Sequence, residues 1–303
     1  PNATTEPATV TGTHTAVLVA QVNPNGLATN VHFEYGLDSR YATTGSSAIV
    51  YNDRTAIQSV GGDSSSHRVT ATVSGLLPNA VYHVRVVAAN SAGRVDGDDL
   101  TFTTRRDRSP GRPVLGRRVN LAPGTGVVFV RGLSSAAASA AAASGTGRGF
   151  VPLTEARQLP VGTVVDARFG SVRIVSAAGR RGTHAGTFSG AIFRISQSGR
   201  TRQHGLTVLR LVENAFKGAP SFAVCHGGSS TQTIQRLHGV AGGKFSLNGR
   251  HASAATVTSS SWSITERCDG TLTTVQSGGV NVSDFKRHKT RFLRSSQHYL
   301  AKP

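Results

Sequence analysis

Short alternating runs of apolar and polar residues, separated by turn residues, dominate this sequence. Alternation with a period of two is typical of half-buried β-strands. The pattern is clearest in residues 253–301, where Asp269-Gly270 and Gly278-Gly279 supply turns because both pairs tolerate positive φ. The strands predicted in this stretch are residues 261–264, 271–275, 280–282 and 290–293.

The first hundred residues show the same pattern in shorter units. Seven short strands within about 100 residues predict a β-sandwich. Residues 1–8, rich in Pro, Asn and Thr, are expected to form an open leader before it. The predicted strands are residues 17–22, 31–36, 48–51, 55–60, 67–73, 81–88 and 100–104.

One motif in this half resembles the fibronectin type III family. Gly75-Leu76-Leu77-Pro78-Asn79-Ala80-Val81-Tyr82 is followed by Ala88-Ala89-Asn90-Ser91-Ala92-Gly93, and the similarity covers about residues 5–104. The resemblance implies a tyrosine corner, in which the Tyr82 hydroxyl bonds to the backbone near Leu77. The usual strand-B Trp of the family is missing, and Leu18 or Val22 is expected in its place. We interpret this segment as a spacer and interaction module.

Residues 105–113 (Arg-Arg-Asp-Arg-Ser-Pro-Gly-Arg-Pro) are predicted to be a linker, because charge, Pro and Gly oppose packing. Residues 114–303 then form a second, larger β-rich domain with an Ala/Ser-rich insertion at 133–149. The fold expected for the whole chain is therefore all-β: a fibronectin type III-like sandwich followed by a larger β-sandwich or β-roll. Strands are predicted at 126–131, 159–166, 170–175, 187–195, 206–211 and 222–225, and a Gly-rich loop at 227–243.

A second, looser resemblance covers about residues 113–303. Leu159-Pro160-Val161-Gly162-Thr163-Val164-Val165-Asp166 and Gln297-His298-Tyr299-Leu300-Ala301 are similar to the two halves of FecR-type β domains. The insertion and residues 212–250 depart from that pattern. The resemblance implies extracytoplasmic sensing or envelope organisation, without chemistry.

The two halves differ in charge. Residues 1–104 carry a net charge of −3, and the remaining residues carry +21, which together make the formal +18 of the chain. Such a cationic domain favours a polyanionic partner. A bias toward Arg over Lys alone is weaker evidence, since a GC-rich genome also produces it.

The chain has two cysteines, Cys225 and Cys268, and a composition rich in Ser, Thr, Gly and Val. An even cysteine count in such a composition predicts one disulfide and a secreted bacterial protein, extracellular or at the cell surface; two free buried thiols are the alternative. The sequence contains no apolar run of 18 residues, so no transmembrane helix is predicted. The absence of Met and of a signal peptide indicates a processed or excerpted chain.

No pattern typical of an active site occurs. The eleven His residues are scattered, and no nucleophile elbow, phosphate loop or pair of nearby carboxylates is recognisable. Asp166 and Ser189 are isolated candidates. We therefore expect no enzyme activity, no metal site and no cofactor.

Two clusters of basic residues are the candidate binding sites. For the linker, an electrostatic handle for a polyanion and a plain solvated segment are both possible interpretations. For the C-terminal cluster, the alternatives are a charged edge that blocks aggregation, contact with an anionic cell-wall polymer or polysaccharide, and nucleic acid, which the sparse aromatics disfavour. The candidate residues are Arg105, Arg106 and Arg108 in the linker, and Lys286, Arg287, Lys289, Arg291 and Arg294 in the C-terminal cluster.

These features lead to one main functional hypothesis and one alternative. The main hypothesis is a non-enzymatic secreted structural or adhesion protein, a subunit of a polymeric appendage or surface layer that self-assembles through exposed β edges. The alternative is a module that binds an anionic envelope polymer or senses a ligand in the manner of FecR.

Overall fold

The computed structural model separates the chain into two compact units, with the division between Arg108 and Ser109. The residues that the structure describes are 1–41, 49, 51–132, 149–179, 182–200, 205–225 and 230–303. The predicted insertion at 133–149 lies outside them apart from Gly149, and so do two of the four residues of the predicted strand 48–51. The described residues contain only strands and two short 3-10 turns, η1 (Ser39–Tyr41) and η3 (Phe222–Val224), so the all-β prediction is confirmed.

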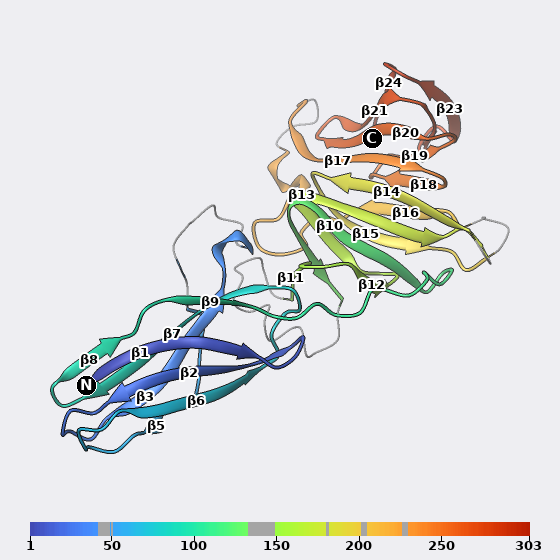
Figure 1. The fold of residues 1–303 in the computed structure, drawn as a ribbon. Coiled ribbons are helices and arrows are strands. Elements are labelled where there is room, and N and C mark those ends of the chain that lie inside the picture. Colours follow the sequence, from blue (N-terminus) through green and yellow to red (C-terminus); the bar gives the residue numbers. More distant parts are fainter. Residues whose placement is uncertain (42–48, 50, 133–148, 180–181, 201–204, 226–229) are drawn as a thin grey trace. The chain divides into compact units, whose positions relative to one another are not determined.

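The N-terminal unit consists of two antiparallel sheets (Figure 1). Alternate side chains of the strands point inward, and Leu18, Val22, Phe33 and Val86 are fully buried. Leu18 and Val22 thus occupy the core, as expected. One sheet has the order β1 (Asn2–Val10), β2 (Thr15–Asn23), β6 (His67–Ser74); the other has the order β4 (Asp53–Arg54), β3 (Asn30–Leu37), β7 (Val81–Asn90), β8 (Gly93–Asp96), with β5 (Gln58–Ser59) on β3 and β9 (Leu100–Thr103) on β7.

The expected open leader is wrong, because residues 2–10 form strand β1 and pair with β2. The Thr5 hydroxyl also accepts a hydrogen bond from the Val86 backbone N–H (3.2 Å). Pro7, which suggested an open segment, lies where the register shifts between Glu6 and Thr9. Proline is tolerated at such an irregularity of an edge strand, since no ladder hydrogen bond is required there.

The contact predicted for Tyr82 is present. The Leu77 backbone N–H donates to the Tyr82 hydroxyl oxygen (2.8 Å), and the ring stacks on Phe102 with 5.6 Å between ring centroids. The hydroxyl thus accepts a hydrogen bond from the buried Leu77 N–H in the turn before β7. The Tyr82 ring itself packs in the core of the unit.

The C-terminal unit is built on two long strands, β10 (Arg118–Arg131) and β13 (Val164–Ala177), which pair along most of their length. The short strands β11 (Val151–Pro152) and β12 (Arg157–Pro160) pair with the other edge of β10. Beyond β13 the sheet divides. The first half of β13 pairs with β15 (Ile192–Gln197), and the second half pairs with β14 (Thr183–Ser189), so two wings of the sheet start from one strand.

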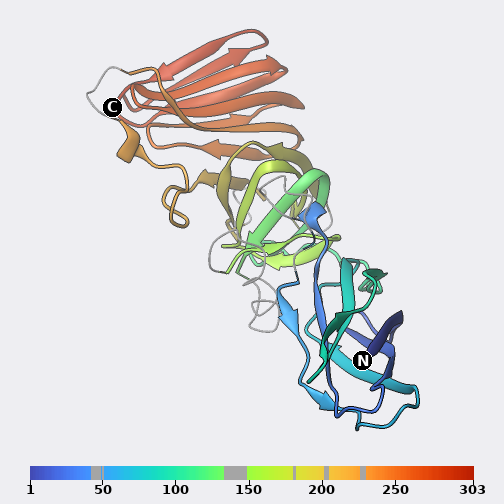
Figure 2. The same cartoon turned by 90° about the vertical axis from the view of Figure 1, so that its left-hand side faces the viewer.

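The first wing continues from β15 through β16 (Thr207–Leu211), β18 (Phe245–Asn248), β19 (Ala252–Thr256) and β22 (Gly279–Asp284) to β23 (Lys289–Arg294). The second wing continues from β14 through β17 (Thr233–Gly242), β20 (Ser260–Arg267) and β21 (Gly270–Ser277) to β24 (His298–Ala301). Figure 2 shows the later strands of both wings, from β17 onward, side by side in the orange and red part of the ribbon.

The two wings share one core. Phe188 of β14 contacts the rings of Phe193 and Phe245 on the first wing and of Trp262 on the second, with centroids 5.1 to 6.5 Å apart. All four aromatic side chains are fully buried. The wings thus face each other as a nearly closed sheet. Burial of this aromatic cluster is a main source of its stability.

The predicted Gly-rich loop 227–243 is wrong for its described part, most of which is strand β17, between β14 and β20. Glycines are typical of loops, yet Gly239 lies inside the strand. A Cβ at Gly239 would lie 2.9 Å from the Phe188 ring, so the missing side chain lets the aromatic cluster pack against the sheet.

Other strand predictions also need correction. The single strand expected at 159–166 is parts of two strands, because β12 ends at Pro160 and β13 begins at Val164. The single strand expected at 187–195 is two strands, because β14 ends at Ser189 and β15 begins at Ile192 on the other wing. Gly190, with φ of 93°, breaks the alternation between them. The strand expected at 222–225 is the turn η3, where the Ser221 hydroxyl accepts a hydrogen bond from the Ala223 N–H (3.1 Å).

Candidate anion-binding surface

The five cationic residues predicted in the C-terminal cluster lie on one hairpin, formed by β22, the turn 285–288 and β23. We refer to this element as the cationic hairpin. Its register runs from Asp284 opposite Lys289 to Gly279 opposite Arg294. Val280, Val282 and Leu293 are buried in the shared core, so the hairpin is anchored by its apolar face while its cations remain in solvent.

All five cations are exposed, and in the described part of the chain none of them forms an ion pair with an Asp or Glu side chain. Lys286 Nζ donates to the Pro303 main-chain oxygen (2.5 Å). Arginines of the N-terminal unit behave differently. Arg85 and Arg94 both contact Glu34 and Asp96, at N···O distances of 2.6 to 3.3 Å. The charge of the N-terminal unit is thus largely compensated internally. The charge of the hairpin is available to a partner.

Tyr299 of β24 contacts three residues of the cationic hairpin. Its hydroxyl donates to Asp284 Oδ2 (2.7 Å) and accepts from Arg287 Nη1 (3.2 Å), and Arg291 lies over its ring with Cζ 5.2 Å from the centroid. Two guanidinium groups are therefore held by one phenol, by a hydrogen bond and by a cation–π contact.

Asp284 is the ionised acceptor of this cluster. Burial on its own would raise the pKa of Asp284, but hydrogen bonds from the Tyr299 hydroxyl and from the Arg287 backbone N–H (2.9 Å) lower it overall. The carboxylate is almost fully buried. It therefore acts as a structural anchor for the turn, and its charge also interacts with that of Arg287.

A groove of about 570 Å³ lies beside the hairpin, at the edge of the sheet. Strand β23 pairs only with β22, and β24 pairs only with β21, within the described residues. The turn 295–297 joins β23 to β24. Residues from both strands and from this turn line the groove: Arg291, Phe292, Leu293, Ser296, Gln297 and His298.

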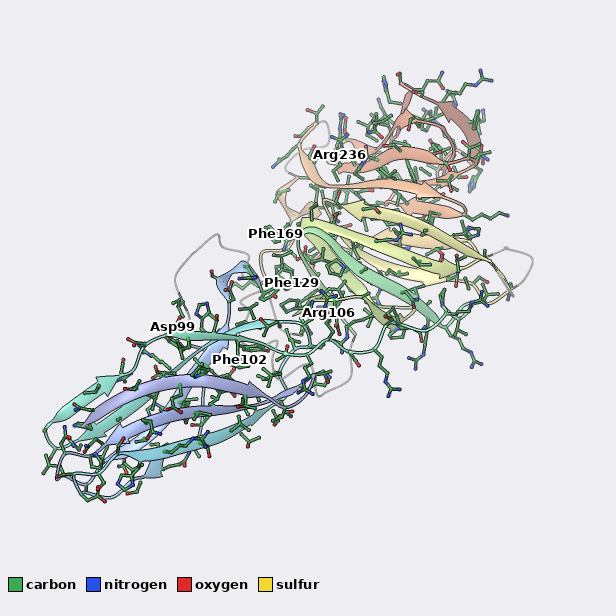
Figure 3. All side chains as sticks on the ribbon, in the orientation of Figure 1. Asp99, Phe102, Arg106, Phe129, Phe169 and Arg236 are labelled. Carbon is green, nitrogen blue, oxygen red and sulfur yellow. A yellow bond between two sulfur atoms is a disulfide. The ribbon has the colours of Figure 1, made fainter. Side chains whose placement is uncertain are left out.

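The linker arginines belong to the other unit. Arg105, Arg106 and Arg108 are exposed and follow β9, and Figure 3 labels Arg106 there. Arg106 Nε donates to Asn79 Oδ1 (3.1 Å), and the Arg105 backbone pairs with Asn79. The first residues of the predicted linker are thus bound to the N-terminal unit.

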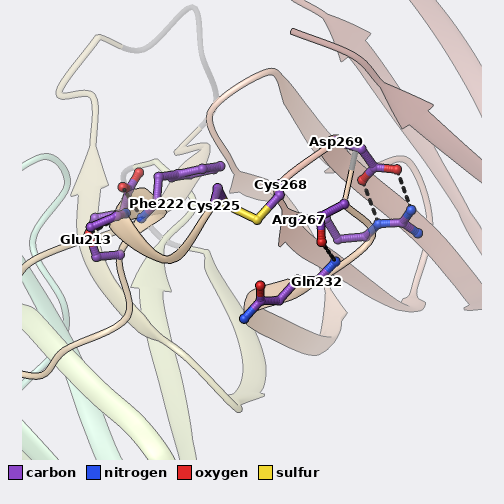
Figure 4. Close-up of a disulfide and its surroundings, with 10 residues drawn as sticks. Glu213, Phe222, Cys225, Gln232, Arg267, Cys268 and Asp269 are labelled. Atoms are coloured by element: carbon purple, nitrogen blue, oxygen red, sulfur yellow. Dashed lines mark hydrogen bonds and ion pairs between the residues drawn. A yellow bond between two sulfur atoms is a disulfide. The ribbon is translucent and has the colours of Figure 1, made fainter. Parts of the chain in front are cut away.

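The predicted disulfide between Cys225 and Cys268 is present (Figure 4). It joins the turn after η3 to the end of β20. The Cys268 N–H donates to the Gln232 carbonyl (3.1 Å), and Arg267 pairs with Asp269 beside it. The bond therefore attaches the segment before β17 to the second wing.

Sequence reasoning did not find the residues that complete this surface, Tyr299, Asp284 and the residues of the turn 295–297. Alternation in residues 298–301 places Tyr299 and Ala301 on one face of a strand, which is the only signal available. Their partners lie on other strands, so the pattern could not show the contacts.

One buried carboxyl lies elsewhere in the shared core. Glu266 Oε1 accepts hydrogen bonds from the Arg250 N–H (2.8 Å) and the Thr271 hydroxyl (2.9 Å), whereas Oε2 has no partner among the described residues. Burial raises the pKa of Glu266, and the two hydrogen bonds oppose the shift only partly. No group of three or more His, Cys, Asp or Glu side chains in the described residues could hold a metal ion.

Comparison with known proteins adds little. No family model matches the chain, and no curated protein matches it. Three solved structures of the sensor domain of the anti-sigma factor RsgI4 from Pseudobacteroides cellulosolvens are similar at 17% identity. They cover 35 to 38% of this chain and 75 to 98% of the sensor-domain chains, with TM-scores of 0.23 to 0.26. Values this low carry no inference about function, and neither family resemblance is established.

No helix in the described residues is long and apolar enough to span a membrane.

Proposed function

We propose that the protein is a non-enzymatic, secreted cell-surface protein that adheres to an anionic polymer through its cationic hairpin. The observation that carries the proposal is the exposure of five cations on one hairpin, none of them in an ion pair with an Asp or Glu side chain in the described part of the chain. A charged edge of this kind attracts an extended polyanion, since several charges act together along one strand.

The disulfide supports an extracellular location, because such bonds persist mainly in oxidising compartments. The N-terminal unit supports a spacer role. Its sheets have the orders β1-β2-β6 and β4-β3-β7-β8, and the Tyr82 contact is the one that the fibronectin type III resemblance implied. We therefore assign to it a fibronectin type III-like sandwich that acts as a spacer.

The decisive experiment compares two triple variants of the full chain. Lys289→Gln, Arg291→Gln and Arg294→Gln remove the three cations of β23 from the hairpin, whereas Arg173→Gln, Arg194→Gln and Arg210→Gln remove three exposed cations elsewhere on the same unit. Binding to immobilised dextran sulfate at low salt should fall at least about tenfold in the first variant and little in the second. Affinity of the natural protein should also decrease as ionic strength rises.

The experiment also separates binding from a purely protective role of the charges. Charged edge strands block edge-to-edge association, so neutralisation would then cause oligomers to form while polymer binding by the monomer stays unchanged. Equal binding losses in both variants, or no binding at low salt, would contradict the proposal.

The open edges favour a second candidate function, a subunit of a surface layer or appendage. Strands β23 and β24 end the path of the sheet and expose unpaired edges. Because β23 is cationic, it would pair with a different, acidic strand and not with its own copy. Sedimentation velocity at high concentration tests this candidate, and a monodisperse monomer would exclude it.

A further inference from the structure

Strand β23 has one free edge, and the hydrogen bonds around it show which main-chain groups face that edge. The Arg294 N–H donates to Gln297 Oε1 (2.8 Å), and the Arg294 carbonyl accepts from the Gln297 N–H (3.1 Å). Both main-chain groups of Arg294 therefore point away from β22. Because the main-chain groups of successive residues alternate between the two edges of a strand, those of Phe292 and Thr290 point the same way.

The other strand of the hairpin gives the same alternation. The Val257 N–H donates to the Gly279 carbonyl (3.1 Å), so this carbonyl faces β19. The next residue, Val280, therefore faces β23, where it lies opposite Leu293. The ladder between β22 and β23 thus uses Leu293 and every second residue before it, and it leaves out Phe292.

The N–H and C=O groups of Thr290 and Phe292 are consequently four unpaired main-chain groups on one edge. No residue in the described part of the chain bonds to them, since β23 pairs only with β22 there. Both residues are exposed. A row of free donors and acceptors along a strand is a template for one more strand.

The groove beside β23 leaves room for such a strand. Its lining includes the consecutive residues 291–293 of β23 and the consecutive residues 296–298 of the turn and β24. Side chains of consecutive residues point to opposite faces of a strand, so a lining of this kind follows the edge of β23 and not one of its faces. An extended peptide matches this shape, because its own side chains also alternate between the two faces.

The side chains of β23 decide which strand fits. Lys289 and Arg291 lie on one face and Arg294 on the other, and all three are exposed. A second copy of β23, paired antiparallel through all four free groups, would set Arg291 opposite Arg291, which is unfavourable. Acidic residues opposite Lys289 and Arg291, with a β-branched residue opposite Phe292, are favourable cross-strand pairs.

We infer that the free edge of β23 binds an acidic, extended segment of another protein as an added antiparallel strand. Antiparallel pairing is the more stable arrangement per residue, and β23 already has it with β22. The partner residues opposite Phe292 and Thr290 each exchange two hydrogen bonds with β23. The partner residue between them lies opposite Arg291, carries a carboxylate and turns its main-chain groups away. Because the main chain makes the recognition, the inference goes beyond polymer adhesion and does not depend on it.

The test uses the full chain and a synthetic peptide, acetyl-Glu-Val-Val-Glu-Thr-Glu-amide. In the antiparallel register its third residue lies opposite Phe292, its fourth opposite Arg291 and its fifth opposite Thr290. N-methylation of the third or the fifth residue removes an N–H that bonds to β23. N-methylation of the fourth residue removes an N–H that points away from β23. All the modified peptides keep the charge of the parent peptide, so the one modified at the fourth residue is the matched control.

Isothermal titration at low salt should show binding of the parent peptide. N-methylation of the third or the fifth residue should weaken binding at least about tenfold, since a hydrogen bond is lost and a methyl group enters the interface. N-methylation of the fourth residue should change binding less than about twofold, because its N–H faces away. Equal weakening by all the N-methyl groups, or no binding of the parent peptide, would overturn the inference.

Two variants of the chain separate strand addition from polymer adhesion. Thr290→Pro removes an N–H of the free edge and leaves the ladder to β22, and proline is tolerated at such a position of an edge strand. Thr290→Val is its matched control, because it also loses the hydroxyl contact with Ser283 (3.1 Å) but keeps the N–H.

Thr290→Pro should weaken binding of the parent peptide at least about tenfold, whereas Thr290→Val should not. Both variants should bind dextran sulfate as the natural protein does, since all cations remain. Equal peptide binding by the two variants would contradict strand addition. Dextran sulfate binding without peptide binding in the natural protein would overturn the inference and leave the proposed function intact; the reverse result would overturn the proposed function alone.

Discussion

The Tyr299 hydroxyl donates a hydrogen bond of 2.7 Å to Asp284 Oδ2, which joins β24 to β22 where no backbone pairing connects the wings. Asp284 in turn accepts from the Arg287 N–H (2.9 Å). One buried carboxylate therefore fixes both the closing strand and the cationic turn. The position of the candidate binding residues depends on this contact.

Tyr299→Phe should lower the free energy of unfolding of the C-terminal unit by about 2 kcal/mol, because the Asp284 carboxylate loses a charge-assisted partner. Urea denaturation followed by the fluorescence of Trp262, the single Trp of the chain, measures this. Asp284→Asn and the double variant complete a cycle. If the two losses add without coupling, the hydrogen bond does not contribute as described.

Glu266 should make stability fall as pH rises. Burial raises the pKa of Glu266 in the folded protein above the ordinary 4.5, which applies to the unfolded chain. At a pH between the unfolded and the folded pKa, the unfolded chain has lost a proton that the folded protein retains. Stability from this group is thus full below about pH 4.5 and decreases above it, up to the folded pKa. Glu266→Gln should remove that decrease, as measured by urea titrations from pH 4 to pH 9. A pH profile identical to that of the natural protein would contradict this prediction.

Loss of the disulfide should destabilise the C-terminal unit only. Cys225 and Cys268 are 43 positions apart, and on the chain-entropy model such a loop contributes about 4 kcal/mol. Cys225→Ser with Cys268→Ser should therefore shift the Trp262 transition to lower urea. A second transition, from the N-terminal unit and visible by circular dichroism, should stay unchanged. A shift of both transitions would show that the two units unfold together.

Phe188 should be among the most sensitive core positions. Its ring contacts three other aromatic rings across the two wings, and it is fully buried. Phe188→Ala should cost roughly 3–5 kcal/mol through lost burial and the cavity left behind. Phe285→Ala, at an exposed position, is the control and should cost less than about 1 kcal/mol. Thermal unfolding of both variants distinguishes the two cases.

Local pattern was sufficient for features that depend on neighbours in the sequence. Alternation identified most strands. The motif around Tyr82 predicted the contact of this residue with Leu77. The closely spaced cations from Lys286 to Arg294 indicated the charged hairpin. The loop predicted at 227–243 is wrong for residues 233–242, which form β17. A glycine in a strand cannot be told from a glycine in a loop by sequence, because the reason for Gly239 is the Phe188 ring that packs against it.

Alternation, cysteine count and charge can be read from neighbouring residues, and they predict an all-β protein with one disulfide and a cationic C-terminal segment. The change of wings between Ser189 and Ile192 and the contact of Tyr299 with Asp284 depend on the three-dimensional pairing of strands. Strand pairing joins residues far apart in the chain, and a period of two says which face a side chain occupies but not which strand lies opposite. The groove beside Phe292 is a product of that pairing, because its two walls come from strands that end opposite wings of one sheet.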